Sequence, residues 1–229
     1  MTNAAFDSWL PPGGLILDIG CANGRSTQAL RHSGFRAVGL EIDPDLVDQL
    51  RRDPATRHLP AGRADARRLP LKGGVADGAI LIEVLEHISD PDAVLREIRR
   101  VVRPGGRLCV AVPTAYTEAV YDRLHPQYLQ NAGHLNRFKR QDLQQRLERA
   151  GFDVQRITPQ NLAPAVSWLA HAIVRSEADH TGALLEHRWI DYAVAGGFRL
   201  GDAIPGVRRI VAALRARFGK SRYFYCVAT

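Results

Sequence analysis

Short apolar segments alternate with segments of helical period through most of the chain, and this alternation constrains the fold more than any other feature. Chains of this kind form a parallel sheet whose two faces are covered by the intervening helices. The sequence therefore predicts an α/β protein. Strands are predicted at residues 14–20, 36–43, 58–65, 75–84, 107–113, 152–158 and 222–229, and helices at 26–34, 44–52, 92–102 and 140–151.

Several of the predicted boundaries carry their own signals. Asp43-Pro44 and Asp90-Pro91 each place a capping carboxylate before a proline that a first helical turn tolerates. Gly34 follows a helix and can adopt the left-handed conformation that ends one. The segment 75–84 is almost continuously apolar, as a strand covered on both faces requires, so we expect it in the middle of the sheet.

Size and composition indicate one folded domain covering residues 1–229. A chain of 229 residues can bury a substantial core, and 45% hydrophobic with 24% charged residues excludes a largely disordered protein. The net charge of +7 comes mainly from arginine. Basic charge can serve nucleic acid, an anionic membrane or an acidic substrate, and only its clustering would choose among them.

The cysteines and the N-terminal residues favour a reducing, cytoplasmic compartment. Cys21, Cys109 and Cys226 are odd in number and widely spaced, so no disulfide framework is implied. The first residues, MTNAAFDSWLPPGG, do not resemble a secretory signal. Elsewhere the apolar runs are too short or too interrupted for a bilayer span.

A glycine-rich turn follows the first predicted strand in LDIGCANG (17–24), where glycine allows positive φ and close approach of a ligand. The spacing D-x-G-x-x-x-G resembles motif I of class I S-adenosylmethionine-dependent methyltransferases. The resemblance implies that Asp18 orients the ammonium group of the cofactor, and that Ala22 stands where relatives often have glycine. The alternative is a tight turn without a ligand. The turn residues assigned to the cofactor are Gly20, Cys21, Ala22 and Gly24.

Carboxylates follow the next strands as well. Glu41 ends the second predicted strand, where a doubly wound fold places an acceptor for both ribose hydroxyls, with Ile42 beside it. Asp43 competes for this role, but its place before a proline suits helix capping better. Asp65 resembles the acceptor for the adenine amine, with Ala66 contributing backbone, and a plain turn carboxylate is the alternative.

Residues 77–113 resemble the middle of a class I subgroup that includes ubiquinone-biosynthesis, sugar and natural-product O-methyltransferases, and the resemblance extends over about 11–160. It implies a doubly wound, Rossmann-like sheet of seven strands with an antiparallel last strand. It also implies S-adenosylmethionine as the cofactor, with Glu83 at its edge.

The segment EVLEH places Glu83, Glu86 and His87 at i, i+3 and i+4, which is one face if a helix follows the strand directly. Some enzymes that resemble this chain, including small-RNA terminal 2′-O-methyltransferases, hold Mg²⁺ or a similar ion on such a face, and His134 matches their later histidine. Other relatives with EVLEH need no metal, so both interpretations stay open.

The polar, aromatic segment 114–136 is predicted to be an irregular loop long enough to be functional. Without a metal, His134 is the first candidate for a general base, because an unperturbed histidine titrates near neutral pH. His125 is the second candidate, and Glu83 lies where the acceptor is expected. A solvated loop histidine is the alternative for both.

Residues 161–220 form a predicted helical insert before the last strand, suited to a lid, a substrate pocket or a homodimer surface. Within it, residues 206–220 form an amphipathic helix that docks on the core or lies on an anionic membrane, and core docking is preferred.

These features together predict O-methylation of a hydroxyl on a sugar, glycolipid or natural product. Methylation of RNA ribose is the competing activity, although no aromatic and arginine platform for single strands is evident, so nucleic acid is not the expected partner. A catalytically silent cofactor-binding protein is the third alternative.

Overall fold

The computed structural model describes residues 8–124, 133–160 and 221–229. The chain divides into two compact units. The first comprises residues 1–111, 141–157 and 224–229, and the second comprises 112–140 and 158–223.

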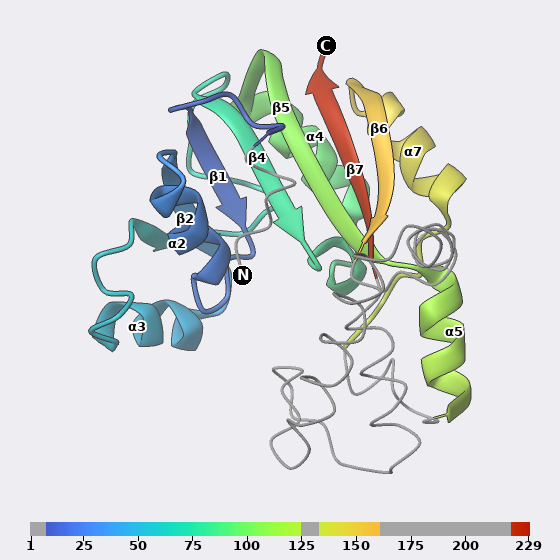
Figure 1. Ribbon diagram of the computed structural model, residues 1–229, viewed down its shortest axis with the longest axis horizontal. Helices are drawn as coiled ribbons and strands as arrows, with labels where there is room; N and C mark the ends of the chain where they lie inside the picture. Colours follow the sequence, from blue (N-terminus) through green and yellow to red (C-terminus); the bar gives the residue numbers. More distant parts are fainter. Residues whose placement is uncertain (1–7, 125–132, 161–220) are drawn as a thin grey trace, which may run out of the picture. The chain divides into compact units, whose positions relative to one another are not determined.

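Seven strands form one sheet in the order β3-β2-β1-β4-β5-β7-β6 (Figure 1). The last strand runs antiparallel to its neighbours, and β1 pairs in parallel with both β2 and β4. The predicted α/β class, the seven strands and the antiparallel last strand are confirmed. The strands are β1 Leu15–Ile19, β2 Arg36–Glu41, β3 Ala61–Arg63, β4 Ala76–Ile82, β5 Val102–Pro113, β6 Phe152–Gln160 and β7 Ser221–Ala228.

The helices begin where the sequence signals indicate. Asp43 accepts a hydrogen bond from the Asp45 amide at 2.8 Å, and Asp90 accepts one from the Ala93 amide at 2.9 Å, so both capping predictions are confirmed. The helices described are α2 Arg25–His32, α3 Pro44–Arg52, the 3₁₀ helix η1 Leu85–His87, α4 Pro91–Val101, α5 Ala115–Leu124 and α7 Arg140–Arg149.

The centre of the sheet is its most buried part. Strand β4 is the middle strand of the sheet, as predicted, and lies between β1 and β5 (Figure 1). Its residues Ile80 and Leu81 are fully buried. Helix α4 presents Val94, Leu95 and Ile98, also fully buried, to this core. Burial of each such side chain contributes about 1.5–3 kcal/mol.

One carboxylate joins four strands of the first unit, β1, β2, β4 and β5. Asp77 of β4 accepts hydrogen bonds from the Leu15 amide at 2.7 Å and from Arg103 Nε at 2.7 Å. Arg36 of β2 lies 3.5 Å from the same carboxylate. The hydrogen bond from Leu15 and the neighbouring arginines lower the pKa of Asp77.

Two predictions of local structure were wrong. Residues 114–136 were predicted to be irregular, but α5 occupies the first part of this segment. Its aromatic and β-branched residues form helices poorly on their own, so tertiary contacts outweigh local preference there. The fifth strand was predicted over 107–113, but β5 begins at Val102, and Gly105 with φ +74° lies where its pairing with β4 is irregular.

Some predictions concern residues outside those described. His125 and the insert 161–220, with its amphipathic segment 206–220, belong to this group, and the lid, dimer and membrane hypotheses for them stay predictions. None of the helices in the described ranges combines the length and apolar content that a bilayer span requires.

Asp77 provides a test of how the first unit is held together. Asp77→Ala leaves the Leu15 amide without this acceptor, and we expect the free energy of unfolding to fall by about 1–3 kcal/mol in urea titrations. Because the folded pKa is lowered, the contribution of Asp77 is present at neutral pH and disappears as the pH falls through that pKa. The matched control is Asp48→Ala, because this α3 carboxylate is 53% exposed and forms only long ion pairs. Equal losses in the two variants would contradict the assignment.

Candidate functional site

The glycine turn after β1 has an unusual backbone. Gly20, Ala22 and Gly24 have φ of +70°, +44° and +74°, in the left-handed region that side chains disfavour. A Cβ on Gly20 would lie 2.6 Å from Val84 Cγ2, and one on Gly24 would lie 2.8 Å from Leu50 Cδ2. Local packing therefore requires both glycines, and their presence alone does not demonstrate a ligand.

Glu41, at the end of β2, binds the backbone of this turn. Glu41 is 8% exposed, and its carboxylate accepts hydrogen bonds from the amides of Ala22 at 2.9 Å, Ile42 at 2.8 Å and Asp43 at 3.1 Å. A carboxylate has about four acceptor positions, so these bonds leave room for about one more. The predicted contact with both ribose hydroxyls would require one backbone bond to be given up. Sequence reasoning missed this structural role of Glu41.

Asp18 is the second buried carboxylate of the site. It is 2% exposed and accepts a hydrogen bond from Thr27 Oγ1 of α2 at 2.6 Å. Burial raises the pKa of Asp18 to about 6, although the Thr27 hydrogen bonds oppose the shift, and the charge of Glu41 adds to it. A cationic group placed beside Asp18 would favour its ionised form.

Cys21 is a structural residue rather than a nucleophile. Burial, followed by the charges of Asp18 and Glu41, raises the pKa of the Cys21 thiol to about 12. Since the thiolate is the reactive form, this thiol is unreactive at neutral pH. Cys109 and Cys226 are also buried and free.

Asp65, after β3, already has a strong partner. Arg67 approaches it through Nη2 at 2.7 Å and Nε at 3.0 Å, and the Arg67 amide donates at 2.9 Å. The hydrogen bond from the Arg67 side chain lowers the pKa of Asp65. An adenine amine would have to compete with Arg67, which sequence reasoning did not identify, so this contact stays a prediction. Beside Glu41, Ile42 is 51% exposed, and its assignment to the cofactor stays a prediction.

Two α4 side chains hold the segment that follows Asp65. Glu97 accepts a hydrogen bond from the Leu69 amide at 2.6 Å, and Arg100 donates to the carbonyls of Leu69 at 3.2 Å and Leu71 at 2.8 Å. Arg100 also pairs with Glu97 at 2.6 Å. The segment that contains Ala66 is therefore fixed to α4 from both its amide and its carbonyl sides.

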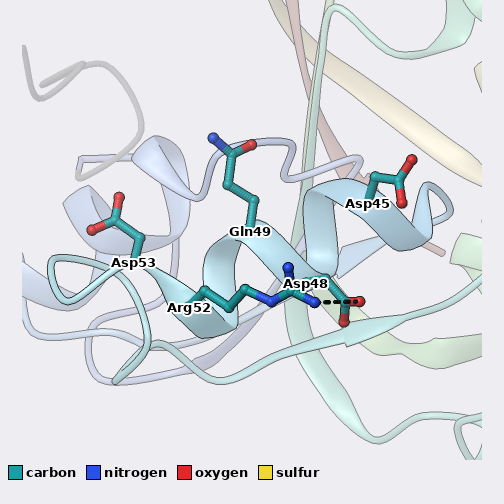
Figure 2. Close-up of a pocket in the computed structure, with 5 residues that line it drawn as sticks. All are labelled: Asp45, Asp48, Gln49, Arg52 and Asp53. Carbon is teal, nitrogen blue, oxygen red and sulfur yellow. Dashed lines mark ion pairs between the residues drawn. The ribbon is translucent and has the colours of Figure 1, made fainter.

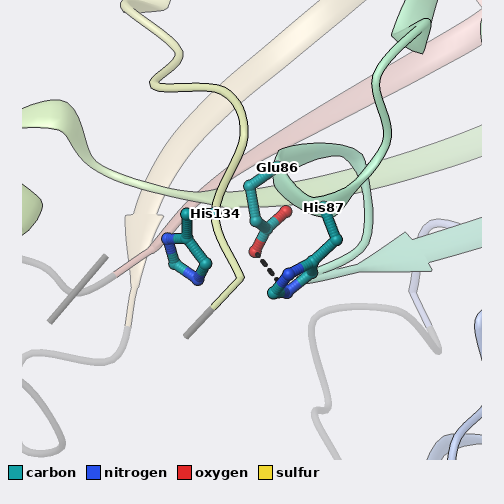
Figure 3. A group of neighbouring side chains, drawn as sticks. All are labelled: Glu86, His87 and His134. Atoms are coloured by element: carbon teal, nitrogen blue, oxygen red, sulfur yellow. Dashed lines mark ion pairs between the residues drawn. The ribbon is translucent and has the colours of Figure 1, made fainter. Parts of the chain in front are cut away.

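The helical face predicted for EVLEH is wrong in its geometry. Glu83 has φ +57°, its amide donates to the Ala111 carbonyl at 2.9 Å, and the helix η1 that follows is only three residues long. A left-handed residue cannot continue a helix, so Glu83 does not share a regular face with Glu86 and His87. Figure 3 shows the Glu86 carboxylate near His87, with 4.0 Å between Oε1 and Nε2. The metal prediction stays a prediction.

The second unit holds a buried carboxylate and imidazole pair. His134 Nδ1 lies 2.6 Å from Glu118 Oε1, and the two side chains are 8% and 2% exposed. Helix α5 supplies Glu118, whose amide donates to the Thr114 carbonyl at 3.0 Å. Sequence reasoning found His134 but missed Glu118, because the segment was predicted as a loop. The available signal was the four-residue spacing of Tyr116, Val120 and Leu124.

A pocket over α3 lies among different residues from those predicted to bind the cofactor (Figure 2). Its charges are balanced in part by an ion pair of 3.8 Å between Arg52 and Asp48. The lining side chains are polar and belong to one helix and its end, so this pocket has the character of a solvated surface. The residues that line the pocket are Asp45, Asp48, Gln49, Arg52 and Asp53.

Residues 2–157 match the family described as "Methyltransferase domain". The chain is 34% identical over 167 residues to an O-methyltransferase of Penicillium expansum, covering 66% of this chain and 56% of that protein. It is 32% identical over 123 residues to a demethylmenaquinone methyltransferase of Mycolicibacterium gilvum, covering 54% and 52%. The chain thus spans little more than half the length of these relatives.

The fold is similar to that of a geranyl diphosphate methyltransferase solved in complex with SAM. The TM-score is 0.65 at 15% sequence identity, covering 99% of this chain and 84% of that one. At this identity the similarity concerns the fold alone.

The raised pKa of Asp18 predicts a specific pH dependence of stability. The folded pKa of about 6 lies above the unfolded value, so the neutral form stabilises the fold below pH 4, and this stabilisation is lost as the pH rises through 6. The loss is on the order of 3 kcal/mol. Asp18→Asn keeps an acceptor for Thr27 and cannot ionise. We expect its unfolding free energy, relative to the unmodified protein, to rise between pH 4 and 7 in urea titrations, and parallel curves would refute the shift.

Proposed function

The chain belongs to the methyltransferase domain family, and we propose on this basis that it transfers a methyl group from S-adenosylmethionine to a hydroxyl of a small molecule. The observation that supports this most directly is the cradle formed by Asp18, the turn at 20–24 and Glu41. Ligands of open α/β sheets bind outside the carboxyl ends of the strands, where these residues lie.

Each part of the cradle suits one part of the cofactor. S-adenosylmethionine supplies an electrophilic methyl group on a sulfonium when bound. Asp18 would hold the ammonium group, and Glu41 would accept from a ribose hydroxyl through the acceptor position that its three backbone bonds leave. Ile42 and the backbone at Ala66 would contact adenine. Asp65 would accept a hydrogen bond from the adenine amine in place of one from Arg67.

The acceptor is proposed to carry a hydroxyl on a sugar, glycolipid or natural product. The O-methyltransferase among the relatives supports oxygen as the methylated atom, and the demethylmenaquinone methyltransferase supports a small molecule. Leu135, beside His134, is 64% exposed, and Tyr116 on α5 is 52% exposed. Exposed apolar side chains of this size suit an acceptor with an apolar body.

His134 is proposed as the base that takes the proton from this hydroxyl. Alignment and exclusion of water supply much of the rate of methyl transfer, and a base is needed because an alcohol must lose its proton. His125 and Glu83 remain the other candidates from the sequence. A divalent cation on Glu86 and His87 is the alternative means of activating the hydroxyl, and activity that survives a chelator would reject it.

The cradle is tested by cofactor binding. Glu41→Gln replaces an acceptor of three amides by a group that can accept through only one atom. We expect calorimetry to show at least tenfold weaker binding of S-adenosylhomocysteine, since buried unsatisfied groups cost about 1–3 kcal/mol. Asp45→Asn, on the exposed start of α3, should leave affinity unchanged. Thermal unfolding of each variant separates lost binding from lost folding.

Two further outcomes distinguish the proposed activity from its alternatives. Labelled methyl transfer from S-adenosylmethionine into cell extract should give a small organic product. Label recovered in RNA would instead support a ribose methyltransferase. Tight cofactor binding with no transfer to any acceptor would support a catalytically silent protein. An unmodified protein that binds neither the cofactor nor its demethylated product would overturn the proposal.

A further inference from the structure

We infer that Glu118 is a positioning residue that fixes the tautomer and orientation of His134 for proton transfer. This inference rests on the proposed function, because it concerns the base of the same reaction. It concerns only residues of the second unit, where both side chains are described. Neither the family match nor the sequence pattern assigned a role to Glu118.

The first step is the geometry of the pair. The separation of 2.6 Å between Glu118 Oε1 and His134 Nδ1 is short, as in hydrogen bonds that involve an ionised group. Glu118 is fixed within the first turn of α5, where its amide donates to the Thr114 carbonyl. A carboxylate held by a helix can impose one ring orientation on its partner, which a solvated histidine would not keep.

The second step is the burial of the pair. Glu118 is 2% exposed and His134 is 8% exposed at their side chains, so each would cost several kcal/mol to bury without a partner. A buried pair of this kind is seldom a net source of stability, because desolvation offsets the attraction. The presence of this buried pair is better explained by the orientation that Glu118 imposes on the His134 imidazole. The pair Arg137 and Asp122, in the same unit, is 46% and 39% exposed and makes a natural comparison.

The third step is the chemistry that follows. With Glu118 accepting from Nδ1–H, the nitrogen able to take a proton is Nε2. As the acceptor oxygen forms its bond to the methyl carbon, the carbon–sulfur bond breaks and its electron pair stays on sulfur. The hydroxyl proton moves to Nε2, and Glu118 stabilises the imidazolium while exchanging no proton itself. The carboxylate therefore acts through His134 and does not touch the acceptor.

The test compares Glu118→Gln with Asp122→Asn, whose carboxylate belongs to the exposed pair. We expect Glu118→Gln to lower kcat at least tenfold, with KM for S-adenosylmethionine unchanged and the pH profile of kcat displaced. Asp122→Asn should stay within twofold of the unmodified enzyme. The double variant Glu118→Gln/His134→Ala should be no slower than His134→Ala, because the carboxylate acts only through the imidazole. A twofold or smaller effect of Glu118→Gln, or independent losses in the double variant, would overturn the inference.

A second measurement does not depend on activity. Nitrogen NMR of ring-labelled histidine, with the His134 signal assigned from His134→Ala, should show the tautomer protonated at Nδ1 in the unmodified protein. Glu118→Gln should shift this signal toward a mixture of tautomers. A His134 signal typical of the Nε2–H tautomer in the unmodified protein would overturn the inference even where Glu118→Gln does not fold. Absence of any methyl transfer would refute the proposed function. The NMR result would still show whether Glu118 fixes the tautomer of His134.

Discussion

The site depends on one carboxylate that accepts hydrogen bonds from backbone amides. Glu41 accepts three amide hydrogen bonds, one from the turn after β1 and two from the residues that follow β2. These bonds join the ends of two neighbouring parallel strands and stabilise a turn in which Ala22 has φ +44°. Glu41 thereby pairs amides that would otherwise be unsatisfied at a buried edge of the sheet.

The same edge of the sheet concentrates negative charge where little water is available. Asp18 lies buried beside Glu41, and the raised pKa of Asp18 reflects the cost of keeping it ionised there. A ligand that carries positive charge would relieve that cost, whereas a phosphate would increase it. The electrostatics of the cradle therefore favour a cationic cofactor over a dinucleotide, which agrees with the family match. Glu97 and Arg100 also bind backbone groups, and these bonds hold the segment after β3 on helix α4.

How far the sequence predicted this structure depended on whether a signal was local. Asp43 and Asp90 precede prolines and cap helices as expected, because capping involves only residues within one turn. Asp65 was placed at the end of a strand, but its pairing with Arg67 was not foreseen, since an arginine two residues away has many rotamers. Glu83 was expected to begin a helical face, and its left-handed backbone follows from pairing with Ala111, a contact between distant segments.

The sequence by itself determined the order of the strands and of helices α2, α3, α4 and α7, the caps, and the carboxylates at the strand ends, because periodicity and turn chemistry act over a few residues. Only the tertiary structure decided which groups those carboxylates bind. Glu41 accepts from backbone amides, Asp77 joins four strands, and Glu118 contacts His134 from a helix that the sequence pattern did not predict. Partner choice for a carboxylate depends on burial and on residues remote in the chain, and local preference carries no information about either.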